Sequence, residues 1–207
     1  MKNIRAISPD FRIKAKIYGN TSKKGGFTVK DLKGSKTEAN LMAAYAGESQ
    51  ARTKYTIYAE KAKKDGYQQI GAIFSETAEN ERAHAEIWLK LLHDGIPNTE
   101  NALKDAAGGE HYEWNDMYPQ FAEEARAEGF DHIAVLFDMV AKIEQEHEKR
   151  FQKLIGNLAQ GLVFSKEGDT VWICRNCGHL VFGKGAPAVC PVCKHEQAYF
   201  QVKAENY

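Results

Sequence analysis

Apolar residues recur at spacings of three and four along the chain from residue 37 to about residue 159. This period is typical of amphipathic helices. Gly66, Gly95 and Gly129 interrupt the pattern as helix C-terminal glycines do, and they divide it into four segments of roughly 25–30 residues. Four long helices with short connections predict a four-helix bundle. If the second and third helices run parallel, the connection near Gly95 has to cross the length of the bundle, so we expect the first residues of the third segment to be extended.

The helical part of the sequence contains an internal repeat with an offset of 63 residues. Glu81 corresponds to Glu144, and His84 corresponds to His147. Five further pairs keep the same offset: Gly66 with Gly129, Tyr67 with Phe130, Ile70 with Ile133, Phe74 with Phe137, and Tyr55 with Tyr118. The repeat predicts two helical hairpins related by duplication.

A different pattern begins after Gly161, where strand-forming residues are interleaved with turn residues. Residues 165–169, of sequence SKEGD, are polar and predict a turn before a small β-rich domain. The chain therefore divides into a basic N-terminal extension (1–35), a helical domain (36–162) and a β-rich domain (167–207). The core predicted for the last domain is aromatic: Trp172, Phe182, Tyr199 and Phe200.

Two helical segments carry a polar motif inside an apolar stripe. The stripe of the second segment includes Glu81 and His84, and that of the fourth includes Glu144 and His147. A core-facing stripe should stay apolar, and an unpaired buried carboxylate costs several kcal/mol. Residues at i and i+3 lie on one face of a helix, so each Glu-x-x-His motif aims a carboxylate and an imidazole at one place. A lone motif of this kind is commonly a surface pair, but two copies at matching repeat positions predict a metal site.

The first and third segments should each add a carboxylate. Glu48 is the candidate in the first segment, and Glu110 and Glu113 are the candidates in the third. The spacing to the glutamate of the following Glu-x-x-His motif is 33 residues from Glu48 but 34 from Glu110. The extra residue falls between Glu110 and Tyr118. We interpret it as a π-bulge, a feature often found at functional sites.

All four cysteines lie in two Cys-x-x-Cys pairs: Cys174, Cys177, Cys190 and Cys193. Such pairs bring thiolates and nearby backbone N–H groups to a tetrahedral metal ion. Iron and zinc both accept four thiolates, so the pattern alone leaves the metal open. His179 and His195 follow the pairs, but four thiolates already complete the site. A linked redox-active site favours iron, whereas a zinc ribbon would be structural.

Together these segments resemble the rubrerythrin family. The resemblance rests on residues 46–52 (AGESQAR), 76–84 (ETAENERAH), 117–119 (MYP) and 144–148 (EQEHE), and on the C-terminal cysteine pairs. It covers the chain from about residue 30 to its end. It implies a mainly α fold, in which a ferritin-like four-helix bundle is followed by a small rubredoxin-like β-rich metal domain.

The resemblance also implies seven ligands for two irons, and one further iron held by the four cysteines. The ligands of the di-iron site would be Glu48, Glu81, His84, Glu110, Glu113, Glu144 and His147. Of these, Glu81 and Glu144 would bridge the irons. Tyr55 and Tyr118 would hydrogen-bond ligand carboxylates, and simple packing in the core is the alternative for both tyrosines.

The function that the resemblance implies is a non-haem di-iron peroxidase, which reduces hydrogen peroxide to water in oxidative-stress defence. Electrons would pass through the four-cysteine iron from rubredoxin or an NAD(P)H-dependent reductase, and the protein would be a homodimer or higher homo-oligomer. A ferroxidase or iron-handling protein similar to ferritins is one alternative. A zinc-ribbon binding module on a helical scaffold is another, and it leaves the repeated Glu-x-x-His motif unexplained.

Charge and hydropathy narrow the possible partners. Lys plus Arg equals Asp plus Glu at 28 each, which argues against a general nucleic-acid binder. No apolar run approaches the roughly 18–20 residues of a membrane helix. No apolar region follows Met1 as in a secretory signal, so we expect a cytoplasmic protein. Residues 1–35 are basic and rich in glycine, which predicts a flexible tail or, alternatively, an organelle-targeting segment.

Overall fold

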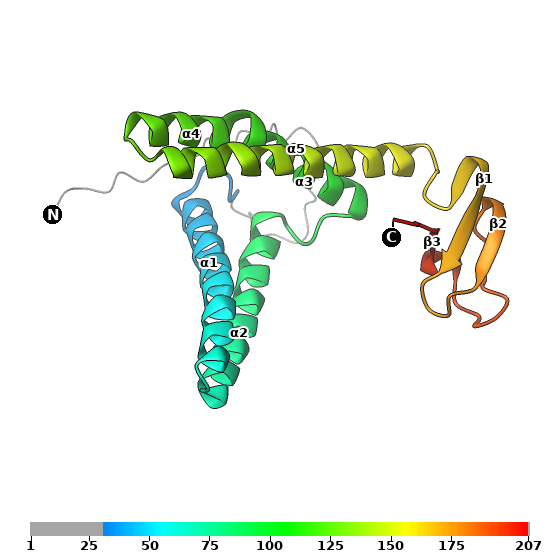
Figure 1. The fold of residues 1–207 in the computed structure, drawn as a ribbon, viewed down its shortest axis with the longest axis horizontal. Coiled ribbons are helices and arrows are strands. Elements are labelled where there is room, and N and C mark those ends of the chain that lie inside the picture. The colour runs from blue at the N-terminus through cyan, green and yellow to red at the C-terminus, as the bar shows by residue number, and fades with distance from the viewer. Residues whose placement is uncertain (1–30, 207) are drawn as a thin grey trace, which may run out of the picture. The chain divides into compact units, whose positions relative to one another are not determined.

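The computed structural model describes residues 31–206, which form two helical hairpins and a small β-domain (Figure 1). The fold is mainly α with a β-rich C-terminal region, as the sequence predicts. Most of the basic extension predicted over residues 1–35 lies outside the described residues. Within residues 31–206, no helix combines the length and the apolar character needed to cross a membrane.

The first hairpin consists of α1 (Lys36–Lys64) and α2 (Gln68–Leu92). Ser35 begins α1, because its side chain accepts a hydrogen bond from the backbone N–H of Glu38. Gly66 follows α1 with a φ of 90°, in the left-handed region that commonly ends a helix. The buried residues of the hairpin are all small: Ala59, Ala62, Gly71, Ala78 and Ala85. Small side chains let the two helices pack closely and leave the larger apolar side chains nearer the surface.

The second hairpin contains α3 (Thr99–Tyr112), the π-helix η1 (Glu113–Met117), α4 (Tyr118–Ala127) and α5 (Asp131–Ala159). The first three follow one another without a break and run beside α5 (Figure 1). Its buried residues are also small: Ala107, Ala122, Ala125 and Ala134. The π-helix lies where the sequence spacing placed one extra residue, so the predicted π-bulge is confirmed.

The connection between α2 and α3 consists of residues 93–98. The backbone N–H of Gly95 donates to the carbonyl of Lys90 at 2.7 Å and closes the end of α2. The side chain of Asn98 accepts a hydrogen bond from the backbone N–H of Asn101 at 2.9 Å and begins α3. Residues 96–98 lie outside the helix and Asn98 has an extended backbone, but the chain is helical from Thr99 onward, so the expected long extended start of the third helix was wrong.

The β-domain is a three-stranded antiparallel sheet in the order β2-β1-β3. Its strands are β1 (Ser165–Cys174), β2 (Leu180–Gly185) and β3 (Phe200–Val202), and the short 3-10 helix η2 (Gln197–Tyr199) precedes the last. Residues 165–169 belong to β1, so the prediction of a turn there was wrong. The pairing of β1 with β2 is irregular between Ser165 and Thr170, and this irregularity accommodates the polar segment within a strand.

The core of the β-domain consists of Trp172, Cys174, Ala186, Cys190 and Phe200. Trp172 and Phe200 are buried as predicted, at 0% and 3% exposure. Phe182 is 73% exposed and Tyr199 is 45% exposed, so their prediction as core residues was wrong. The strand register explains the exposure of Phe182. Trp172 pairs with Val181, and the next residue along a strand faces the opposite side of the sheet.

Replacing Gly129 with alanine should destabilise the protein by about 1 kcal/mol, because its φ of 84° is strained for an L side chain. No atom lies within 4 Å of the added Cβ, so crowding does not add to this cost. Gly156, within α5, is the matched control, because a Cβ added there also meets no atom within 4 Å. Gly156→Ala should stabilise the protein by roughly 0.5–1 kcal/mol. Urea denaturation followed by circular dichroism measures both changes, and an equal sign for the two would contradict the assigned role of Gly129.

Candidate metal centres

The first hairpin holds one cluster of metal-ligating side chains. Glu48 lies on α1, and Glu81 and His84 lie one turn apart on α2. The Nδ1 atom of His84 is 3.0 Å from Oε2 of Glu81 and 3.9 Å from Oε1 of Glu48. One ligand atom of each residue lies within 4.8 Å of the other two. These three residues are the first half-site.

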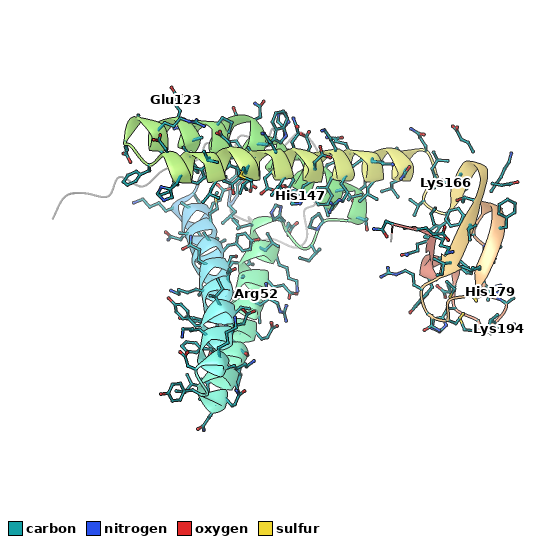
Figure 2. All side chains as sticks on the ribbon, in the orientation of Figure 1. Arg52, Glu123, His147, Lys166, His179 and Lys194 are labelled. Carbon is teal, nitrogen blue, oxygen red and sulfur yellow. The ribbon has the colours of Figure 1, made fainter. Side chains whose placement is uncertain are left out.

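The second hairpin holds a matching cluster. Glu110 lies on α3, and Glu144 and His147 lie on α5, where His147 is labelled in Figure 2. The Nδ1 atom of His147 is 2.6 Å from Oε2 of Glu144 and 3.5 Å from Oε2 of Glu110. Their ligand atoms also lie within 4.8 Å of one another. These three residues are the second half-site.

The two half-sites share one geometry. In each, the histidine contacts the glutamate one turn earlier on its own helix and a glutamate from the neighbouring helix. An aromatic pair repeats as well: the ring centroids of Tyr55 and Phe74 are 5.9 Å apart, and those of Tyr118 and Phe137 are 6.0 Å apart. The duplication inferred from the sequence therefore extends to the side-chain geometry.

Each half-site offers two carboxylate oxygens and one imidazole nitrogen, a donor set that suits iron among the first-row metals. The side chains of the four glutamates are 14–28% exposed. Partly buried carboxylates that lie close together repel one another, and a bound cation removes this cost. Three protein ligands also leave coordination positions open, so each half-site can share its metal with further ligands.

Glu113, the extra carboxylate predicted from the third segment, is the first residue of η1. Burial raises the pKa of Glu113, and the charges of Glu144 and Glu110 raise it further. Burial and Glu144 also raise the pKa of Glu110, while His147 opposes the shift. Glu113 therefore lies close to Glu110 and Glu144 of the second half-site. Protons and metal ions compete for these three carboxylates.

The two tyrosines predicted beside the site have different surroundings. Tyr118 directly follows η1, and burial raises the pKa of its phenol, with the charges of the nearby carboxylates adding to the shift. Tyr55 packs its ring against Phe74. The predicted hydrogen bonds from both tyrosines to ligand carboxylates stay predictions.

Trp114, Glu148 and His111 form a hydrogen-bonded group, here called the clamp. Nε1 of Trp114 donates to Oε2 of Glu148 at 2.6 Å, and Nδ1 of His111 lies 3.1 Å from the same oxygen. The rings of His111 and Trp114 meet edge to face with centroids 5.2 Å apart. Burial raises the pKa of Glu148, but the hydrogen bonds from Trp114 and His111 outweigh burial and lower the pKa overall. Because Trp114 lies in η1 and Glu148 in α5, the clamp ties the π-helix to α5.

The clamp was missed in the sequence, although a signal for it was present. Each of its three members directly follows a predicted ligand of the second hairpin along the chain. Neighbouring residues of a helix point about 100° apart, so the clamp occupies the face beside the ligands. The hydrogen bond between Trp114 and Glu148 on that face fixes the rotation of η1 and α5 about their axes. It thereby fixes the direction in which the ligands on these helices point.

The four cysteines of the β-domain form a second kind of candidate metal centre. The Sγ atoms of Cys174 and Cys193 are 3.7 Å apart, and those of Cys177 and Cys190 are also 3.7 Å apart. A tetrahedral site with metal–sulfur bonds of about 2.3 Å has sulfur–sulfur edges of about 3.8 Å. The observed distances fit such a site and are far longer than a disulfide bond of about 2.05 Å.

Backbone N–H groups reach the sulfurs from both cysteine pairs. The N–H of His195, together with hydrogen bonds from Cys177, Asn176 and Cys190, lowers the pKa of Cys193 to about 5. The N–H of His179 acts on Cys177 in the same direction, but the neighbouring thiols outweigh it and raise the pKa of Cys177 to about 12. Four sulfurs this close together do not all lose their protons unless a cation neutralises them. The geometry and the donor chemistry therefore both fit a four-thiolate metal.

Comparison with known proteins agrees with this geometry. Residues 39–155 match the family profile described as rubrerythrin, and residues 172–201 match the profile described as rubrerythrin, rubredoxin-like domain. The chain is 47% identical to rubrerythrin-1 of Clostridium acetobutylicum, with 86% of this chain and 100% of that protein covered. It is 46% identical to a rubrerythrin of Porphyromonas gingivalis, with 86% and 95% covered. It is 45% identical to a rubrerythrin of Nitratidesulfovibrio vulgaris, with 86% and 100% covered.

Replacing Trp114 with phenylalanine should destabilise the metal-free protein by about 1–2 kcal/mol more than Trp88→Phe does. Trp114 loses a hydrogen bond to a carboxylate, whereas Nε1 of the control residue Trp88 is buried and has no hydrogen-bond partner among residues 31–206. Because the pKa of Glu148 is lowered in the folded protein, the clamp stabilises it fully at pH values above the ordinary pKa of a glutamate. This contribution is lost as the pH falls and Glu148 becomes protonated. Urea denaturation at neutral pH and below about pH 4 tests this, and equal losses for the two variants at neutral pH would show that the clamp adds nothing.

Replacing Glu113 with glutamine should raise the melting temperature of the metal-free protein at neutral pH. The raised pKa of Glu113 means that its protonated form favours the folded state, so its ionisation costs stability as pH rises through the folded-state pKa. Below about pH 4 the carboxyl is protonated in both states, and the difference should vanish. Calorimetry at both pH values measures the effect, with Glu146→Gln on the exposed side of α5 as the control. A lower melting temperature for Glu113→Gln at neutral pH would contradict this electrostatic reading.

Proposed function

Because this chain belongs to the rubrerythrin family, di-iron proteins that carry a rubredoxin-like domain, we propose that it is a peroxidase that reduces hydrogen peroxide to water. The observation that carries the proposal is the pair of matching half-sites, one on each hairpin of a ferritin-like fold. Members of the family are generally oxidoreductases, and both metal centres expected of the family have their donor residues in this chain.

We infer that the two half-sites and Glu113 together hold two irons. The ligands would be Glu48, Glu81, His84, Glu110, Glu113, Glu144 and His147. Five carboxylates carry a charge of −5, and two ferrous ions reduce the total to −1, which makes their partial burial tolerable. The glutamates of the two Glu-x-x-His motifs are the ones we propose as bridges, because membership of the rubrerythrin family implies this role for them.

Two ferrous ions, when bound, would supply the two electrons that cleave the O–O bond, and two protons complete the conversion of H2O2 to two molecules of water. Residues of the chain hold the ligands and a hydrogen-bond donor in place for this reaction. The clamp fixes the rotation of η1 against α5 and so directs Glu113 and its neighbours. Tyr118, whose phenol stays protonated because its pKa is raised, is a hydrogen-bond donor beside the carboxylates.

Electrons would enter through the β-domain, with its four cysteines holding an iron. Cys177 is exposed, and Val192, between the cysteines of the second pair, is 63% exposed. An exposed cysteine and an exposed apolar residue within the two cysteine pairs suit the small, transient interface of an electron-transfer partner. The proposed donor is rubredoxin or an NAD(P)H-dependent reductase, and the proposed location is the cytoplasm.

Replacing Glu81 with glutamine should lower peroxide turnover by roughly 100-fold or more, because loss of a direct ligand exceeds the effect of removing its outer partners. Glu79→Gln is the matched control, since Glu79 lies on the same helix, pairs with Arg82 and is 61% exposed. Turnover is measured on reduced protein under anaerobic conditions with stoichiometric additions of peroxide. The visible absorption of the ferric four-cysteine site, recorded before reduction, shows that the β-domain is folded in each sample, and circular dichroism shows the same for the helices.

The same titration separates the peroxidase from the ferroxidase alternative. Wild-type protein with two ferrous ions should consume one equivalent of peroxide far faster than it is oxidised by dioxygen. Faster oxidation by dioxygen, with ferric iron retained in a large cage-like oligomer, would instead identify an iron-handling protein. Unchanged peroxide turnover in Glu81→Gln would refute the proposed site.

A further inference from the structure

The helix formed by α3, η1 and α4 contains one residue more than an unbroken α-helix would have between the same two packed ends. Ala107 on α3 is 2% exposed and Ala122 on α4 is 0% exposed, so packing fixes the direction of the helix on both sides of η1. Ala122 packs in one cluster with Ala134 of α5. Packing at the two ends keeps the extra residue in the helix, but it does not decide at which position between them the residue is accommodated.

The backbone hydrogen bonds show where the extra residue lies. The N–H of Glu113 donates to the carbonyls of Gly109 and Glu110, four and three residues earlier, a sharing that is common at the ends of α-helices. The N–H of Tyr118 donates to the carbonyl of Glu113, five residues earlier, as in a π-helix. Glu110 and Glu113 are therefore joined by α-helical backbone, and at a spacing of three residues their side chains lie on one face.

The position of the extra residue decides where Glu113 points. If it lay between Glu110 and Glu113, the side chain of Glu113 would turn by about 100° relative to that of Glu110. Glu113 would then leave the face on which Glu110 approaches Glu144 and His147. The second half-site would have two carboxylates beside it instead of three.

The clamp supplies a contact that fixes this position. His111 and Trp114 are three residues apart, and both reach Oε2 of Glu148, at 3.1 and 2.6 Å. Side chains at this spacing share a face when the backbone between them is α-helical, and an extra residue between them would turn them apart. The clamp therefore excludes the extra residue from the stretch 111–114, and Glu113 lies within that stretch.

The first hairpin has neither the π-helix nor the clamp. α1 is an α-helix over its whole length. Counted from the matching glutamates and histidines, the places of His111, Trp114 and Glu148 are taken by Ser49, Arg52 and Ala85. The side chain of Ala85 offers no acceptor for a hydrogen bond. Within one chain, the clamp thus accompanies the π-helix.

We propose that Trp114 and Glu148 are positioning residues for Glu113. Their bond, with His111 on the same oxygen, holds the extra residue of the helix after Trp114 and so keeps Glu113 directed at the second half-site. The inference rests on the proposed function, in which Glu113 is a ligand of one iron. Loss of the bond leaves the extra residue free to occupy earlier positions in the helix, and in some of these arrangements Glu113 points away from the metal.

Ferrous-ion binding by the full-length protein tests the positioning. Trp114→Phe keeps an aromatic ring but removes the Nε1 donor, and it should weaken the binding of one of the two irons by roughly 10–100-fold. Asn115→Ala is the matched control, because Asn115 also lies in η1 but bonds to Asp116 within it. Its affinity for ferrous ion should equal that of the wild type. Anaerobic equilibrium dialysis against a series of ferrous-ion concentrations, followed by iron analysis, measures each affinity.

A double variant separates positioning from a general loss of stability. Glu113→Gln should itself weaken iron binding, and adding Trp114→Phe should cause no further loss, because the effect of Trp114 passes through Glu113. Losses that multiply in the double variant, or an unchanged affinity in Trp114→Phe, would overturn the proposal. Glu148→Gln keeps an acceptor oxygen for Trp114 and should bind iron more tightly than Glu148→Leu. Equal losses for these two variants would overturn the proposal as well.

Hydrogen exchange gives a second readout, which needs no metal. In metal-free Trp114→Phe, the backbone amides of residues 113–118 should exchange faster than in the wild type and in Asn115→Ala, because their hydrogen bonds change partners as the extra residue moves. Unchanged exchange would mean that packing alone holds the π-helix, against the proposal. Circular dichroism shows whether each variant keeps its helices, and Glu148→Leu replaces Trp114→Phe in both measurements if the latter does not fold.

The result for Glu113→Gln distinguishes this inference from the proposed function. Unchanged iron binding in Glu113→Gln would refute the proposed ligand set and the inference with it. Weaker binding in Glu113→Gln, together with unchanged binding in Trp114→Phe, would refute the positioning alone.

Discussion

Glutamates lie at partly buried positions within the helices, and the cost of burying carboxylates next to one another in each half-site is the constraint on which the candidate metal centre of the helical part depends. Near the second half-site, burial raises the pKa values of Glu110 and Glu113, and the charge of Glu144 raises them further. Packing does not relieve this cost, because the buried interfaces of both hairpins consist of alanine and glycine and offer no charge. Metal binding relieves it, and so the same ions that would carry out the chemistry would also hold the helices together.

The parts of the site that could be predicted from the sequence are those that depend on periodicity within one helix. Polar residues in an apolar stripe identified Glu81 and His84, and an offset of 63 residues identified their counterparts. A difference of a single residue between two spacings located the π-helix η1. Each of these signals lies within one helix or recurs in the repeat. The period of the helix is therefore enough to tell which way the side chains point.

Features that depend on register or on connection length could not be predicted in this way. Phe182 is as good a strand residue as Trp172, and only the pairing of β1 with β2 decides which of them faces the core. The start of α3 depends on the side chain of Asn98, which competes with an extended crossover that the expected topology required. The bond from Trp114 to Glu148 joins residues 34 positions apart and depends on the extra rotation that the π-helix introduces.

The π-helix also makes the two halves of a duplicated protein unequal. η1 adds Glu113 to the third helix, whereas Gln50 and Ala51 stand at the equivalent place in α1. A cation beside the second half-site is therefore surrounded by more negative charge than a cation beside the first. If two irons bind as proposed, they would differ in their order of loading and in the potential at which each gives up an electron, and the proposed two-electron reaction would have a defined first and second donor.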